Sequence, residues 1–159
     1  MNKIRKNKKK HSKNNVPFFK PQLLEEDKKA VLNSLNSSML TNGPVMDEFE
    51  KKFAKFTKSK YAIAVSNATS ALHLSLMSLG IGRGDEVIIP DLTFIATANA
   101  VLMTGATPVL VDVDSKNFQI SIDSIQKSIT KKTKVILPVH LYGKSCDMTS
   151  IQKIAKKNN

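Results

Sequence analysis

Apolar residues along the chain recur at two different spacings, and their alternation predicts an α/β fold. Four short runs rich in Val and Ile are apolar on both faces, which is typical of strands in a parallel sheet covered by helices. These runs are residues 61–65, 86–89, 108–111 and 134–139. Segments with apolar residues at helical spacing lie between them, at about residues 70–79, 95–103 and 122–130. This order of elements predicts a mostly parallel sheet with flanking helices.

The residues before the first predicted strand have a helical pattern of their own. Helices are expected at residues 21–35 and 45–56, with a loop at residues 37–44 that Gly43 and Pro44 keep irregular. On the second helix, three phenylalanines follow one another at spacings of four and three, so they share one face. These residues, Phe49, Phe53 and Phe56, are predicted to be core.

The net charge of +12 is unevenly distributed along the 159 residues. Seven cations and no acidic residue lie in residues 1–16, which leaves +5 for the remainder. Most cations are Lys, whereas bidentate phosphate or base recognition favours Arg, and aromatic residues for stacking on bases are few. The tail is therefore interpreted as a solvated, disordered extension, with loose polyanion binding as the alternative, and specific nucleic-acid binding is not expected.

Cysteine usage and hydropathy predict a cytoplasmic protein. The single Cys146 has no second cysteine for a disulfide or a metal pair, and it is interpreted as a bystander in a turn. No run approaches the ~20 apolar residues of a membrane helix, and no secretory signal is visible, so no membrane association is expected.

Ligands of parallel sheets bind where the strands end, so the residues that follow each predicted strand are the candidate functional residues. A run of small and hydroxyl residues at positions 66–72 stands where the first predicted strand leads into a helix. Free N–H groups and the positive dipole end of such a helix favour a phosphate or carboxylate, although Ser and Thr at this point are more often plain helix caps. Asp112 and Asp114 are interpreted as a poor metal pair, so no metal site is assigned.

Seven ordered motifs give the chain a specific resemblance from about residue 17 to its last residue. They are LTNGP at 40–44, SNATSAL at 66–72, GDEVI at 84–88, PDLTFIATAN at 90–99, GATP at 105–108, VDVD at 111–114 and PVHLYG at 138–143. With these motifs the chain resembles the front part of the DegT/DnrJ/EryC1/StrS group. These proteins are nucleotide-sugar aminotransferases of fold type I that depend on pyridoxal 5'-phosphate.

The resemblance implies roles for three residues in binding the cofactor. Ala68 and Thr69 match the pair that holds the cofactor phosphate through backbone N–H groups and the Thr hydroxyl. Ala68 stands where Gly is common, and this is acceptable if its φ angle is negative. Phe94 matches the aromatic residue that stacks on the pyridine ring, while a core position is its alternative.

The resemblance also implies what the 159 residues do not encode. The acidic partner of the pyridinium nitrogen and the Schiff-base lysine are expected beyond the helix that ends near Lys157, so no catalytic residue is assigned. Weak or absent cofactor binding by this chain is therefore expected. One hypothesis is the N-terminal portion of an enzyme that transfers an amino group, typically from glutamate, to a nucleotide-linked keto-sugar in surface polysaccharide or amino-sugar biosynthesis. The other is a non-catalytic remnant or interaction module.

The domain organisation that follows has three parts. Residues 1–16 form the basic tail, residues 17–60 the N-terminal helices with an active-site loop, and residues 61–159 part of the transferase large domain. An unpaired sheet edge predicts association, either as a homo-oligomer or with a missing C-terminal part.

Overall fold

The computed structural model describes residues 16–17 and 20–158, so nearly all of the predicted basic tail lies outside the described residues. Two compact units, Met1–Ala62 and Ile63–Asn159, make up the chain.

The first unit contains two helices, α1 (Glu25–Leu35) and α2 (Pro44–Thr57). α1 starts after Leu24, whose N–H donates to the Asp27 carboxylate at 2.8 Å. α2 has Pro44 in its first turn and is followed by the cap residue Lys58, which has a left-handed backbone with φ 56°. Both helices were expected, although α1 begins four residues later than the pattern predicts.

The prediction that three phenylalanines of α2 are core residues is wrong for the described chain. Their side chains share a face, and the rings of Phe49 and Phe53 lie 5.7 Å apart, but all three remain exposed. Helical spacing identifies an apolar face without identifying what covers it. The exposed fractions are 54% for Phe49, 48% for Phe53 and 85% for Phe56.

The second unit is built around a parallel sheet of three strands. The strands are β1 (Glu86–Pro90), β2 (Thr107–Val111) and β3 (Thr133–Ile136). Their order is β2-β1-β3, so β1 is central and is paired on both edges. Three of the four predicted strands are thus confirmed, but β3 ends at Ile136 rather than at residue 139.

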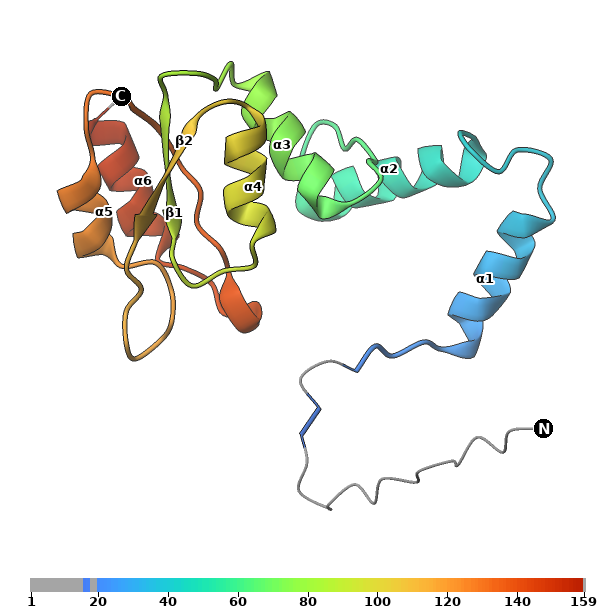
Figure 1. Ribbon diagram of the computed structural model, residues 1–159. Coiled ribbons are helices and arrows are strands. Elements are labelled where there is room, and N and C mark those ends of the chain that lie inside the picture. The colour runs from blue at the N-terminus through green and yellow to red at the C-terminus, as the bar shows by residue number, and fades with distance from the viewer. Residues whose placement is uncertain (1–15, 18–19, 159) are drawn as a thin grey trace, which may run out of the picture. The chain divides into compact units, whose positions relative to one another are not determined.

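Two layers of helices cover the two faces of this sheet (Figure 1). α3 (Ala68–Ser78) and α4 (Ala96–Met103) pack on the face that receives Val87 and Ile89. α5 (Ile122–Ser128) and α6 (Met148–Lys157) pack on the face that receives Ile88. Alternate β1 side chains therefore enter opposite cores, as a strand of period two requires. The predicted α/β class, a parallel sheet with flanking helices, is confirmed.

The prediction of a strand at residues 61–65 is wrong for the described chain. This segment has no regular secondary structure and is not part of the three-stranded sheet. Tyr61 and Ile63 keep 72% and 82% of their surface exposed. Apolar β-branched residues favour strand geometry, but a strand forms only when a neighbour accepts its backbone hydrogen bonds.

Among the described residues, no helix is long and apolar enough to cross a membrane.

Candidate functional site

The connections that follow the three parallel strands lie at one end of the sheet, which we call the carboxyl edge (Figure 1). Phe94 belongs to the connection after β1, Asp112 to the connection after β2, and His140 to the segment after β3. Parallel pairing brings these connections to a common edge, which is where open α/β sheets bind ligands. The sequence predicted this grouping.

The start of α3 has the features of an anion-binding helix end. Asn67 caps the helix, since its side-chain oxygen accepts the N–H of Ser70 at 2.9 Å. The Ser66 and Ser70 hydroxyls lie 3.2 Å apart beside it. Within the described chain, no hydrogen bond is donated by the N–H of Ala68 or Thr69. These two N–H groups and the positive end of the helix dipole are thus available to an anion.

Ala68 meets the backbone condition that its replacement of Gly requires. It is the first residue of α3 and is not among the described residues with positive φ. An N–H group donates equally well from Ala and from Gly when φ is negative. The Ala side chain therefore leaves the donor at this position intact.

Phe94 projects from a short connection that is fixed at both ends. On one side, the N–H of Asp91 donates to the Val111 carbonyl at 2.9 Å. On the other, the Thr93 and Thr97 hydroxyls are 2.9 Å apart, and the N–H of Thr97 donates to the Phe94 carbonyl at 3.0 Å. The ring itself is 77% exposed. It is therefore not a core residue of the described unit, and its face is free to contact a planar group.

The segment after β3 is held by a buried cysteine, which corrects its interpretation as a turn bystander. Cys146 is 5% exposed, and its Sγ lies 3.2 Å from both the Gln119 side-chain oxygen and the Val139 carbonyl. Burial raises the pKa of this thiol, so it remains protonated and donates. Its backbone N–H donates to His140 Nδ1 at 3.2 Å. His140 is thereby engaged in holding the loop.

The two aspartates after β2 are engaged in local turns. The Asp112 carboxylate accepts the N–H of Val113 at 2.8 Å, and the Asp114 carboxylate accepts the N–H groups of Lys116 and Asn117. The part of the chain that the structure describes contains no group of three or more metal-binding side chains. The aspartates therefore shape the connection that leads to α5.

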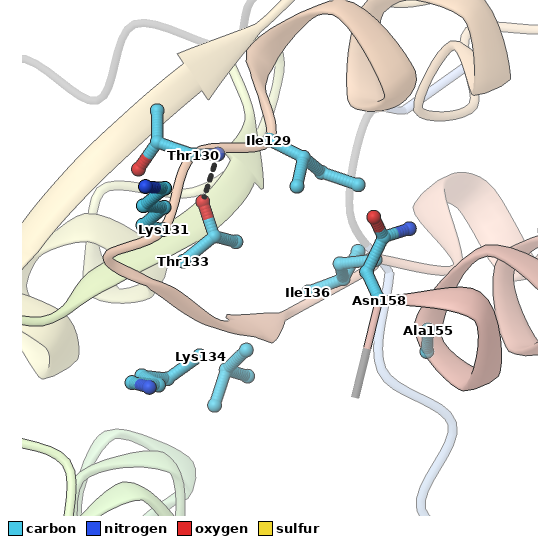
Figure 2. A pocket seen from close by; sticks show the side chains of 9 residues that line it. Ile129, Thr130, Lys131, Thr133, Lys134, Ile136, Ala155 and Asn158 are labelled. Carbon is cyan, nitrogen blue, oxygen red and sulfur yellow. Dashed lines mark hydrogen bonds between the residues drawn. The ribbon is translucent and has the colours of Figure 1, made fainter.

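A pocket of about 470 Å³ lies along β3 and the segment that leads into it, beside the end of α6 (Figure 2). Lys131, Lys134 and Asn158 are among its lining residues. The N–H of Thr130 donates to the Thr133 hydroxyl at 2.9 Å at its border. The pocket is separate from the candidate site, because none of its lining residues belongs to the start of α3 or to the connections that follow the strands.

Known proteins match both the sequence and this arrangement. The model of the DegT/DnrJ/EryC1/StrS aminotransferase family matches residues 21–159. The chain belongs to this family. The expected resemblance is therefore confirmed.

Individual relatives agree with the family assignment. GDP-perosamine synthase of Escherichia coli O157:H7 is 47% identical over 145 residues, which cover 91% of this chain and 40% of the relative. An aminotransferase from Psychrobacter cryohalolentis has a TM-score of 0.83 and 43% identity, covering 90% of this chain and 37% of that one. NtdA from Bacillus subtilis, solved with bound cofactor PMP, has a TM-score of 0.80 and 41% identity, covering 85% of this chain and 32% of that one.

These matches define both the fold and its extent. The structural neighbours are fold type I aminotransferases, so the predicted fold type is confirmed. The chain spans about 40% of the length of the curated relatives that it matches.

Sequence reasoning missed the capping role of Asn67 and the interactions of Gln119. An Asn directly before a helix is a recognisable capping signal, whereas the contact between Gln119 and Cys146 joins residues 27 positions apart.

Proposed function

We propose that this chain forms the N-terminal part of an aminotransferase that uses pyridoxal 5'-phosphate. The reaction would transfer an amino group, typically from glutamate, to a nucleotide-linked keto-sugar in surface polysaccharide or amino-sugar biosynthesis. The observation that carries the proposal is the start of α3, where two N–H groups have no acceptor in the described chain. Family membership supports the same assignment.

Residues at the start of α3 and after β1 fit the cofactor. A phosphate group suits the start of α3, where Ala68 and Thr69 offer backbone N–H groups and Thr69 adds a hydroxyl. A planar pyridine ring suits the exposed face of Phe94. We propose these three residues as the cofactor-binding residues of the chain.

The bound cofactor supplies an electron sink for amino transfer. The chain's own residues bind and orient it. The N–H groups at the start of α3 would fix the phosphate, and Phe94 would fix the plane of the ring. Two anchors at opposite ends of a rigid ligand determine its orientation, which is the protein's main contribution in this part of the chain.

The relatives narrow the proposed substrate and partners. Since several curated relatives are GDP-perosamine synthases, we propose a GDP-linked keto-sugar as the amino acceptor. We also propose that residues 17–60 contribute an active-site loop and residues 61–159 the front part of the large domain. Association as a homo-oligomer, or with the rest of a family-length enzyme, would cover the exposed apolar residues.

Titration of the chain with pyridoxamine 5'-phosphate tests this proposal. This amine form of the cofactor forms no aldimine with lysine, so its binding reports only the phosphate and ring contacts. We expect weak, saturable binding by ³¹P NMR, and no saturable binding of pyridoxamine, which lacks the phosphate, when its own ring signals are followed. Equal binding of both compounds, or no saturable binding of either, would overturn the proposal.

A further inference from the structure

Thr97 is a polar residue on the buried face of α4. It is 4% exposed, and it shares this face with Ala100 and Val101, which are fully buried and belong to the core on this side of the sheet. An apolar side chain would pack at such a position without needing a hydrogen bond. A buried hydroxyl, in contrast, costs free energy unless it is paired. The partner of the Thr97 hydroxyl therefore indicates what this side chain does.

The Thr97 hydroxyl pairs with a side chain that precedes the helix. It lies 2.9 Å from the Thr93 hydroxyl, which is its hydrogen-bonding partner in the described chain. Hydroxyls on α3 behave differently, since those of Ser75 and Ser78 donate to backbone carbonyls of the preceding turn. The contact of Thr97 thus ties α4 to the connection that follows β1.

This contact spans Phe94. Thr93 directly precedes Phe94 in the sequence, and the N–H of Thr97 donates to the Phe94 carbonyl at 3.0 Å. One buried residue of α4 therefore holds both the backbone of Phe94 and the side chain of its neighbour. The Phe94 ring is 77% exposed, so packing within the described unit contributes little to its orientation. The ring direction instead depends on the backbone from which it projects.

We propose that Thr97 is a positioning residue that orients the Phe94 ring for stacking on the pyridine ring of the cofactor. This inference rests on the proposed function, in which Phe94 contacts that ring. A side chain that is already held in its binding orientation loses less conformational freedom when the ligand binds. Affinity is thereby gained without a new contact, and Thr97, which is buried, acts only through Phe94.

The test measures the affinity of Thr97 variants for pyridoxamine 5'-phosphate by ³¹P titration. Thr97→Val keeps the shape of the side chain but removes the hydroxyl, and we expect it to weaken binding about threefold. Thr97→Ser keeps the hydroxyl and should bind like the unmodified chain. Thr104→Val is the matched control, because it removes a hydrogen-bonded hydroxyl at the other end of α4. This control should leave the affinity unchanged.

A double-mutant cycle distinguishes positioning of the ring from a general structural effect. In a Phe94→Ala background, the ring through which Thr97 acts is absent. Thr97→Val should then cause no further loss of affinity for pyridoxamine 5'-phosphate. A general weakening of the fold would lower the affinity by the same factor in both backgrounds.

Three results would overturn the inference. They are unchanged affinity in Thr97→Val, an equal loss in Thr97→Ser or Thr104→Val, and an undiminished effect of Thr97→Val in the Phe94→Ala background. If the unmodified chain still binds pyridoxamine 5'-phosphate saturably and does not bind pyridoxamine, only the role of Thr97 fails. If the unmodified chain shows no saturable binding of pyridoxamine 5'-phosphate, the proposed function and the inference both fail.

Discussion

The interior of the sheet and its carboxyl edge belong to the same unit, but side chains are buried in the interior and exposed at the edge. In the interior, Ile88 and Ile89 of the central strand are fully buried, one in each of the two cores. A few residues further along the chain, Phe94 is 77% exposed. Packing decides the residue types of β1, whereas nothing in the packing of the described unit requires an aromatic residue at position 94. The difference separates residues that stabilise the fold from residues that are available to a ligand.

Truncating a side chain in the interior of the sheet should have the largest effect on stability. Ile88→Ala removes a fully buried side chain between β1 and the helices α5 and α6. We expect it to lower the free energy of unfolding by about 2–5 kcal/mol, because the lost burial and the cavity both contribute. Denaturant unfolding measures this loss, and Ile88→Val should cost about 0.5–1.5 kcal/mol. A negligible loss in Ile88→Ala would mean that the interior is not packed as described.

Truncation at the carboxyl edge should change binding rather than stability. Phe94→Ala removes an exposed ring, so the denaturation midpoint should hardly change. The affinity for pyridoxamine 5'-phosphate should fall by about 0.5–1.5 kcal/mol, the usual contribution of an aromatic pair. Leu92→Ala, in the same connection, is the control and should leave the affinity unchanged. If Phe94→Ala lost much stability but kept its affinity for pyridoxamine 5'-phosphate, Phe94 would be a core residue and not a ligand-binding one.

The same contrast explains what could be predicted from the sequence. The strands β1 and β2 and the helices α3–α5 were predicted because each carries its own periodic pattern and is covered by nearby elements. The strand at residues 61–65 and the buried phenylalanines of α2 were wrong, since both predictions require covering elements that a local pattern does not reveal. Local spacing specifies a face, and its burial depends on distant parts of the molecule.

The candidate site was predictable to a different degree. Residues 66–72 were singled out because small and hydroxyl residues precede a helical pattern, and the structure places the start of α3 there. The contact between the buried Gln119 and Cys146 was not predictable, because it joins residues 27 positions apart in the sequence. A sequence motif can indicate where backbone N–H groups bind a ligand. It does not reveal side chains whose positions depend on residues far away in the sequence.

The central claim is that the N–H groups at the start of α3 bind the cofactor phosphate, and a proline at residue 68 tests it most directly. Proline is favoured at the first position of a helix, and the extended backbone of Asn67, with ψ 168°, is compatible with a following proline. Ala68→Pro therefore removes one N–H donor while leaving the helix intact. Glu25→Pro makes the same change at the first residue of α1 and is the control.

The affinity for pyridoxamine 5'-phosphate, measured by ³¹P titration, decides the question. The account predicts that Ala68→Pro weakens binding about tenfold or more, as expected for a hydrogen bond to a charged group, while Glu25→Pro binds like the unmodified chain. Equal affinity of Ala68→Pro and the unmodified chain, with α3 intact by circular dichroism, would contradict it.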